Sequence, residues 1–288
     1  MSSTPARTEQ AELPLLDVRN LFVDFRTTTG TVGALRDVSF TLGRERLGIV
    51  GESGSGKSTV GRTLLRIHGK NGIVRARRLQ FAGRDLLGLP EREMREIRGR
   101  RMTMVMQDPR YCLNPVLKVG SQLAEACRAH STMGKAEAWQ KAVDMLDVVQ
   151  IRNPARVAEY YPHELSGGMG QRVMIAMMLI PNPDLLIADE PTSALDVTVQ
   201  RQILHLLDRL VAQRRMSLVF ISHDLNLVSG FCDRILIMYR GRIVESCAAD
   251  QLHAARHPYT RGLLDCAPSM DRKVDRLNVL VRDPAWEQ

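Results

Sequence analysis

The chain has 288 residues, of which 44% are hydrophobic, so it can build the core of one large domain with an appendage. No run of eighteen apolar residues occurs, and the first residues lack the apolar core of a signal peptide; we expect residues 1–13 to form a loose polar tail. The five cysteines are scattered without a C-x-x-C pair, which argues against a zinc site and is typical of a reducing compartment.

The net charge of +8 comes partly from two arginine clusters, at residues 75–78 and 98–101. A basic surface can bind nucleic acid or an anionic membrane, or it can simply be solvated. Aromatic residues, which stack on bases in many nucleic-acid sites, make up only 5% of the chain. The composition therefore favours a solvated, arginine-rich exterior over a nucleic-acid interface.

A phosphate-binding loop follows the first three predicted strands, which lie at residues 15–25, 34–42 and 46–50. The loop, residues 51–58, reads GESGSGKS and fits the pattern G-x-x-x-x-G-K-[ST]. Its glycines let backbone N–H groups curl around a phosphate, Lys57 can reach the β- and γ-phosphates, and Ser58 can ligate Mg²⁺. Helical spacing after the loop places the phosphate at a helix N-terminus, where unpaired N–H groups and the dipole favour an anion.

The rest of the chain alternates between strands and helices. A strand is expected at residues 101–107, and residues 118–160 have helical spacing with no strand candidate between them. Further strands are predicted at residues 184–189, 217–222 and 234–239. This alternation predicts an α/β fold with a largely parallel sheet, interrupted by a helical insertion.

The predicted strand in LLIADEP, residues 185–191, ends in two carboxylates. Asp189 would emerge beside the phosphate-binding loop and hold Mg²⁺. Glu190 lies one residue farther along, where a carboxylate can orient or deprotonate an attacking water. A nucleotide kinase would have to leave room for an acceptor hydroxyl, so a carboxylate placed for water favours hydrolysis.

A second helix N-terminus suited to an anion is predicted at LSGGMGQ, residues 165–171. A chain that already has one phosphate-binding loop can use a second such site if two copies pack head to tail. Each copy would then close over the γ-phosphate held by the other. The residues expected to contact the facing nucleotide are Ser166, Gly167, Gly168 and Gln171.

These motifs resemble those of the nucleotide-binding subunits of ABC transporters. Their order is GESGSGKS, MQDP, LSGGMGQ, LLIADE, SALD and SHD, and they fall within roughly residues 14–248. The resemblance implies a P-loop RecA-like core with an antiparallel β subdomain and an α-helical signature subdomain at about 108–180. It also implies a short C-terminal extension at residues 249–288.

The resemblance also implies the site residues. Glu190 would act on the water, His223 would be the switch residue at the γ-phosphate, and Gln107 would touch both Mg²⁺ and the water. Phe25 occupies the position of the aromatic residue that stacks on adenine. The implied ATP contacts are Phe25, Gly51, Ser53, Gly54, Ser55, Gly56, Lys57, Ser58, Thr59, Gln107, Asp189, Glu190 and His223. The implied Mg²⁺ ligands are Ser58, Gln107 and Asp189, and the implied dimer-interface residues are Ser193, Ala194, Leu195 and Asp196.

Two further stretches, QDPRYCLNP at 107–115 and HPYTRGLL at 257–264, resemble the peptide/nickel importer subfamily. That resemblance implies a second ATPase subunit, two transmembrane permeases and, indirectly, a substrate-binding protein, with this chain at the cytoplasmic face of the membrane. Many relatives end in a cysteine-rich segment associated with an iron–sulfur cluster. Because only Cys266 stands in that region, no such cluster is expected. The cargo stays open between dipeptides, oligopeptides, nickel and metal chelates.

Two other classes of protein compete with an importer subunit. A soluble ABC-type ATPase that acts on nucleic acid or ribosomes would suit the positive charge. Such proteins generally carry two nucleotide domains or a long coiled-coil insertion, and neither is evident here. A P-loop nucleotide kinase has no use for LSGGMGQ. The preferred interpretation is an ATP-hydrolysing importer subunit with no nucleic-acid partner.

Overall fold

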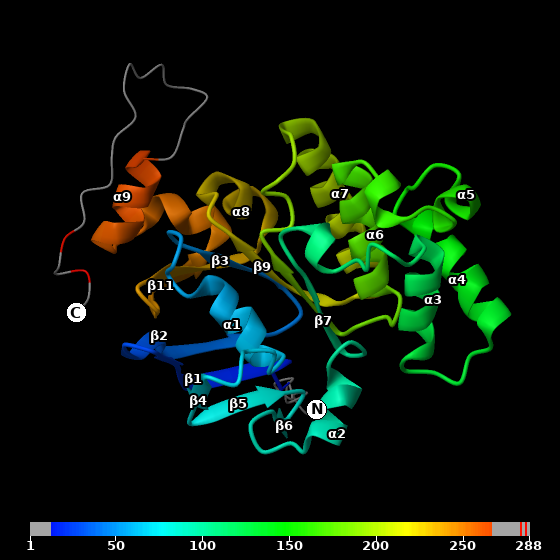
Figure 1. The fold of residues 1–288 in the computed structure, drawn as a ribbon. Coiled ribbons are helices and arrows are strands. Elements are labelled where there is room, and N and C mark those ends of the chain that lie inside the picture. The colour runs from blue at the N-terminus through cyan, green and yellow to red at the C-terminus, as the bar shows by residue number, and fades with distance from the viewer. Residues whose placement is uncertain (1–12, 267–282, 284–285, 287–288) are drawn as a thin grey trace, which may run out of the picture.

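The computed structural model describes residues 13–266, 283 and 286, which form two β-sheets and nine α-helices (Figure 1). The expected polar tail at residues 1–13 lies outside the described residues, apart from Leu13. Much of the expected C-terminal extension lies outside them as well. Two short 3₁₀ segments connect into the helical part of the chain, and a third, Ala249–Ala254, precedes the last helix.

The larger sheet has the strand order β11-β10-β3-β9-β8-β7. Its strands are β3 (Arg46–Val50), β7 (Met102–Val105), β8 (Leu185–Asp189), β9 (Ser217–Ser222), β10 (Arg234–Tyr239) and β11 (Arg242–Ala248). Neighbours pair in parallel except in the β10–β11 hairpin. The five parallel strands are almost wholly buried, as expected of strands covered on both faces. The predicted parallel sheet is confirmed, whereas β11 is half-exposed and gives no apolar run that would predict it.

The smaller sheet is antiparallel and has the order β2-β1-β5-β6, with β4 also paired to β1. Its strands are β1 (Leu16–Thr27), β2 (Gly30–Leu42), β4 (Gly72–Arg75), β5 (Arg78–Phe81) and β6 (Arg84–Asp85). The two long strands were both expected from amphipathic alternation, and they carry buried residues toward the core and polar residues outward.

The helices are α1 (Lys57–Leu64), α2 (Glu91–Ile97), α3 (Val119–Arg128), α4 (Lys135–Val148), α5 (Pro154–Ala158), α6 (Gly167–Leu179), α7 (Val197–Arg214), α8 (Leu225–Phe231) and α9 (Pro258–Cys266). Helices α3, α4 and α5 stand together at one side of the molecule, and α9 lies at the opposite side (Figure 1). The helical stretch expected at 118–160 is confirmed. The subdomain bounds at 14–248, 108–180 and 249–288 stay predictions.

Two hydrophobic cores lie on the two faces of the parallel sheet. Alternate residues of one strand illustrate the division: Leu218 and Phe220 of β9 pack with the helical core, and Val219 and Ile221 pack with the antiparallel sheet and α1. The carboxyl ends of the parallel strands are therefore fixed from both sides, which is where ligands bind in open α/β sheets. Within the described residues, no helix combines the length and the hydropathy needed to cross a membrane.

Candidate nucleotide site

The phosphate-binding loop connects the buried strand β3 to helix α1. Gly56, directly before the helix, has φ 98°, and a Cβ there would lie 2.8 Å from the Ala34 carbonyl oxygen. A side chain would therefore be both strained and crowded at this position. No side chain among the described residues caps the first turn of α1. The first backbone N–H groups of the helix are thus left for another acceptor, and a phosphate suits them.

Lys57 is a buried cation, with only 5% of its surface exposed. Its ammonium donates to the carbonyl oxygens of Gly51 and Glu52 at 2.7 and 2.8 Å. Burial lowers the pKa of Lys57 below its ordinary value of 10.5, while the nearby charges of Glu190 and Asp189 act in the opposite direction. An ammonium has three N–H donors, so beyond these two carbonyl acceptors among the described residues its third donor can serve an anion.

Ser58 and Asp189 bring two oxygen donors together beside the lysine. The Ser58 hydroxyl donates to the Asp189 carboxylate at 2.7 Å, although 131 residues separate them in the chain. Asp189 is the last residue of β8 and is 5% exposed. Burial raises the pKa of Asp189 above its ordinary value of 3.8, and the Ser58 hydrogen bond partly opposes that shift. A hydroxyl and a carboxylate are hard oxygen ligands, so this pair fits Mg²⁺.

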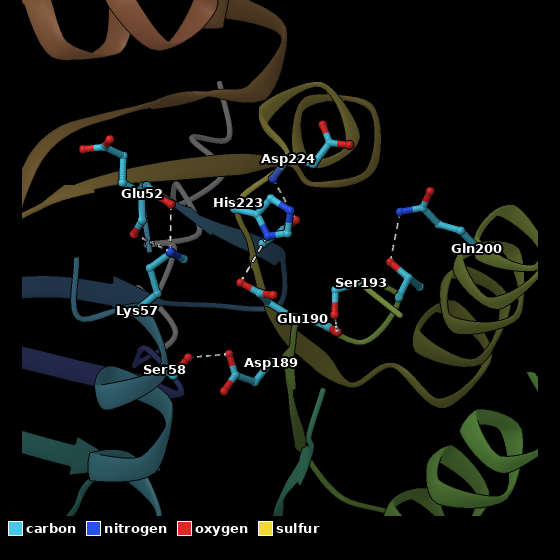
Figure 2. Close-up of polar contacts among 12 residues, drawn as sticks. Glu52, Lys57, Ser58, Asp189, Glu190, Ser193, Gln200, His223 and Asp224 are labelled. Carbon is cyan, nitrogen blue, oxygen red and sulfur yellow. Dashed lines mark hydrogen bonds and ion pairs between the residues drawn. The ribbon is translucent and has the colours of Figure 1, made fainter. Parts of the chain in front are cut away.

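Glu190 follows Asp189 and has φ 47°, an uncommon backbone conformation for a residue other than glycine. Its N–H donates to the Ile221 carbonyl of the next strand at 2.9 Å, which anchors the turn. The Glu190 carboxylate lies 3.2 Å from Nδ1 of His223, whose side chain is 59% exposed. Strained residues that their surroundings hold in place often mark functional sites. Figure 2 shows Lys57, Ser58, Asp189, Glu190 and His223 gathered around one space at the carboxyl ends of the strands.

A cavity of about 510 Å³ opens at these residues. That volume lies within the usual range for small-molecule sites, ~300–1,000 Å³. Its lining residues are Ala34, Ser53, Gly54, Gly56, Lys57, Ser58, Thr59, Arg62, Met106, Gln107, Asp108, Tyr111, Asp189 and Glu190. Most of the residues that the sequence assigned to the nucleotide thus line one cavity.

Some predicted site residues lie outside that lining. Phe25 is half-buried on β1 and packs against the antiparallel-sheet core, so its contact with adenine stays a prediction. Ser55 is buried, and it borders a smaller cavity that residues 52–54, Tyr239 and Arg240 also line. His223 does not line the cavity, but its ring contacts the carboxylate of Glu190, which does.

Arg62 and Tyr111 are among the lining residues that the sequence analysis missed. Arg62 lies one turn after Ser58 on α1, so helical periodicity alone would have placed it on the same face. Tyr111 is 83% exposed and follows Gln107 by four residues, in a segment whose sequence gives no periodic signal.

The signature and the SALD segment pack against each other within one chain. Ser166 is the N-cap of α6, and its hydroxyl accepts from the Met169 N–H at 3.3 Å. Asp196 is the N-cap of α7 and accepts from the N–H groups of Thr198 and Val199. A Cβ on Gly168 would lie 2.8 Å from Val199 Cγ1, so Gly168 allows the two helix starts to approach.

A second cavity, of about 590 Å³, lies beside the signature. It is lined by Ser166, Gly167, Gln171, Ala194 and Leu195, and by residues of the segment that follows Gln107. Asp108 borders both cavities, so residues 107–110 separate the signature from the phosphate-binding loop of the same chain.

Gln171 is arranged differently from its predicted neighbours. It is 1% exposed, and its side-chain amide donates to the Pro191 carbonyl, directly after Glu190. Its side chain therefore connects α6 to the turn that carries the two carboxylates. The predicted contact of Gln171 with a facing nucleotide stays a prediction, and in this structure its amide serves the inside of the chain.

Comparison with known proteins identifies the family of this chain. The sequence profile of the family described as ABC transporter matches residues 35–193. A Brucella abortus protein named for peptide import and ATP binding is 49% identical over 266 residues, which cover 92% of this chain and 80% of that protein. The chain belongs to the ABC transporter family.

Other relatives and solved structures extend the family match. The oligopeptide transport ATP-binding protein OppD of Haemophilus influenzae is 45% identical, covering 94% of this chain and 84% of OppD. The dipeptide transport ATP-binding protein DppD of Lactococcus lactis is 45% identical, covering 93% of this chain and 77% of DppD. The ATP-binding cassette MJ0796, solved as a dimer after hydrolysis with ADP and Pi, superposes with a TM-score of 0.70 at 26% identity. That match covers 81% of this chain and 98% of the cassette. This ABC cassette is an ATPase with the predicted α/β fold.

Proposed function

We propose that this ABC ATPase powers the import of peptides by permeases in the cytoplasmic membrane. The observation that carries the proposal is the convergence of Lys57, the Ser58–Asp189 pair and the Glu190–His223 pair on one cavity. The relatives at 45–49% identity named for peptide, oligopeptide or dipeptide transport support the cargo class. No residue near the cavity itself bears on the cargo, because an ATPase subunit does not contact it.

ATP binds, in this proposal, with its phosphates at the start of α1. The Lys57 ammonium and the first N–H groups of the helix hold the β- and γ-phosphates, and Ser53 and Thr59 line the same wall. Ser58 and Asp189 would hold Mg²⁺ with Gln107, and the ion would offset the charge of the phosphates. Binding an anion and a cation together also relieves the desolvation of the two buried charges, Lys57 and Asp189.

Hydrolysis rests on Glu190. Its carboxylate orients a water and accepts its proton, while His223 fixes the carboxylate from the other side at 3.2 Å. The Ile221 carbonyl holds the Glu190 backbone, so the acid does not need to reorganise when the reaction starts. His223 is exposed enough to reach a γ-phosphate as well.

A second ATPase subunit, of the same or a related kind, would complete each site. The N-terminus of α6 at Ser166 would face the nucleotide of the other subunit, with Ser193 to Asp196 at the interface. Two permeases would hold the pair at the cytoplasmic face of the membrane.

The alternative of a nucleic-acid or ribosome ATPase gains nothing from the arginine clusters. Arg75 pairs with Asp24, Arg78 with Asp17, and Arg98 with Glu91. Arg100 and Arg101 pair with Glu96 and Asp184. Most of the clustered charge is therefore neutralised within the chain, which suits a solvated exterior rather than a phosphate-binding stripe.

Reconstitution tests the proposed function. The chain, co-purified with transmembrane permeases, should hydrolyse ATP faster when a peptide-loaded binding protein is added. Peptides of different lengths and nickel would be compared as cargo. An ATPase that responds to RNA or DNA, with a steep salt dependence, and ignores the permeases would contradict the importer proposal.

A further inference from the structure

Helix α9, which begins within the HPYT segment, contacts the phosphate-binding loop directly. Tyr259, in its first turn, is completely buried, and its hydroxyl accepts a hydrogen bond from the backbone N–H of Glu52 at 3.0 Å. The two residues are 207 positions apart in the sequence. A segment that follows the cassette core therefore supplies a hydrogen-bond partner to the loop that receives the phosphates.

The tyrosine ring is fixed by its surroundings. Its centroid lies 4.5 Å from that of Tyr239 at the end of β10 and 5.6 Å from that of Trp286. The Tyr259 N–H donates to His257 Nδ1 at 3.2 Å, and the Glu245 carboxylate of β11 accepts from the N–H groups of Arg256 and His257. The hydroxyl is thus held by β10, β11 and α9 together, and it cannot turn away from the loop without displacing packed rings.

The peptide group that donates to Tyr259 also accepts from the catalytic-site lysine. The Glu52 N–H and the Gly51 carbonyl belong to one peptide unit, which is planar and here trans. Its N–H meets the Tyr259 hydroxyl, and its carbonyl oxygen accepts from Lys57 Nζ at 2.7 Å. The next carbonyl, of Glu52, accepts from the same ammonium at 2.8 Å (Figure 2 shows Glu52 beside Lys57). Because the unit is rigid, the orientation of its N–H sets the direction of the carbonyl that holds Lys57.

The loop borders a small cavity on the side of the β10–β11 turn. A cavity of about 150 Å³ is bordered by residues 52–55, Tyr239 and Arg240, so the outer side of the loop is not tightly packed. The β10–β11 turn adds one contact, from the Gly241 N–H to the Ser55 carbonyl at 2.9 Å. Gly51 is packed against the Met238 carbonyl, but the Glu52 end of the peptide borders the cavity and can shift if its N–H loses its acceptor.

We infer that Tyr259 is a positioning residue for the nucleotide site: it fixes the Gly51–Glu52 peptide plane and, through it, the Lys57 ammonium. The HPYT segment is in this way part of the phosphate-binding machinery although it touches no phosphate. The inference rests on the proposed binding of ATP at Lys57. A partner protein that moves α9 would therefore also shift Tyr259, the Gly51–Glu52 peptide and the Lys57 ammonium.

Tyr259→Phe tests the inference, since it removes only the hydroxyl and keeps the ring packing. The full chain should bind MgATP roughly 2- to 10-fold more weakly by calorimetry, the range for one lost hydrogen bond. In the complex with permeases, KM for ATP should rise while kcat at saturating ATP stays near wild type. Amide hydrogen exchange of the peptide containing Glu52 should quicken with no fall in exchange protection of the parallel sheet. The matched control is Tyr160→Phe, whose ring packs on Arg156 in the helical region, and it should leave all three measurements unchanged.

The outcomes separate the inference from the function on which it rests. If wild type and Lys57→Ala bind MgATP equally poorly, the proposed ATP site itself fails. If wild type binds and Tyr259→Phe binds equally well, or exchanges at Glu52 at the wild-type rate, Tyr259 positions nothing and the inference is wrong. A Tyr259→Phe chain that no longer folds also overturns it, because the hydroxyl would then serve stability rather than the loop.

Discussion

At the scale of single residues, we propose that Glu190 decides whether the site hydrolyses ATP or only binds it. The Glu190→Gln variant should bind MgATP as wild type does but lose about 10²- to 10⁴-fold in turnover, because an amide can hold water yet cannot accept its proton. Lys57→Ala should instead weaken binding itself, since it removes the buried ammonium. Steady-state ATPase rates and calorimetric titrations of both variants check this. Equal turnover in wild type and Glu190→Gln would remove Glu190 from the mechanism.

The buried carboxylate of Asp189 lowers the stability of the nucleotide-free protein. Its buried carboxylate is disfavoured by desolvation, which raises its pKa. Asp189→Asn should therefore stabilise the nucleotide-free chain by on the order of 1 kcal/mol, seen as a higher melting temperature. The same variant should lose the further stabilisation that MgATP gives wild type, about 2.7 kcal/mol at one hundred times Kd.

The control for Asp189→Asn is Asp184→Asn, directly before the same strand. Asp184 is 45% exposed and pairs with Arg101, so its loss should neither raise the melting temperature nor alter the response to MgATP. A destabilised Asp189→Asn chain, or one still stabilised fully by MgATP, would contradict this account.

At the scale of elements, the signature glycines differ although they are adjacent. A Cβ on Gly168 would meet Val199 Cγ1 at 2.8 Å, on a β-branched side chain that cannot swing aside. A Cβ on Gly167 would meet only Leu195 Cδ2, at an ordinary 3.8 Å. Gly168→Ala should lower the stability by roughly 1–3 kcal/mol. Gly167→Ala should stay within about 1 kcal/mol of wild type.

Thermal melting of the two alanine variants side by side measures that contrast. Equal melting temperatures would mean that α6 and α7 separate without cost and that Gly168 does not govern their packing. Because both variants keep Ser166 as the N-cap, any difference between them belongs to the α6–α7 contact.

The same elements show what can be predicted from sequence and what cannot. Lys57, Ser58 and Asp189 are recognisable because each lies at a fixed place after a strand or at a helix start, and local rules describe those places. The buried bond from Gln171 to Pro191, and the hydroxyl of Tyr259 at Glu52, join segments far apart in the chain. No periodicity or spacing encodes such contacts, since only the packed fold brings their partners together.

At the scale of the whole molecule, strand and helix alternation predicts the parallel sheet but not its strand order. The β3 strand pairs with β9 and β10, which begin about 170 and 190 residues later, because the crossover helices must cover both faces. The half-exposed strand β11 and the four-residue strand β4 lie at edges, where side chains need not be apolar. Edge strands have few apolar residues by which to predict them, whereas buried strands are predicted from their apolar runs.

The whole molecule also argues for a paired assembly. The start of α1 and the start of α6 are both helix N-termini, yet they border different cavities separated by residues 107–110. A nucleotide at Lys57 would therefore be covered only on the side of the phosphate-binding loop. The signature of a second subunit can cover the other side, supply further hydrogen-bond donors and exclude bulk water. ATP should join two subunits, and hydrolysis should release them, which would give the proposed permeases a cycle of closing and opening.

Ser166→Arg tests that assembly. Ser166 is exposed, so the monomer can accommodate the arginine, but a facing subunit cannot close over it. Glu190→Gln protein with ATP should form dimers by light scattering, with its partner ATPase present if the pair is mixed, and the Ser166→Arg double variant should stay monomeric with its ATP affinity largely intact. Ser166→Ala controls for the lost N-cap, worth about 1 kcal/mol, and Thr132→Arg controls for the added charge on an exposed loop. Dimers of the Ser166→Arg variant, or full ATPase activity in a monomer, would show that the signature does not complete the site of a neighbouring subunit.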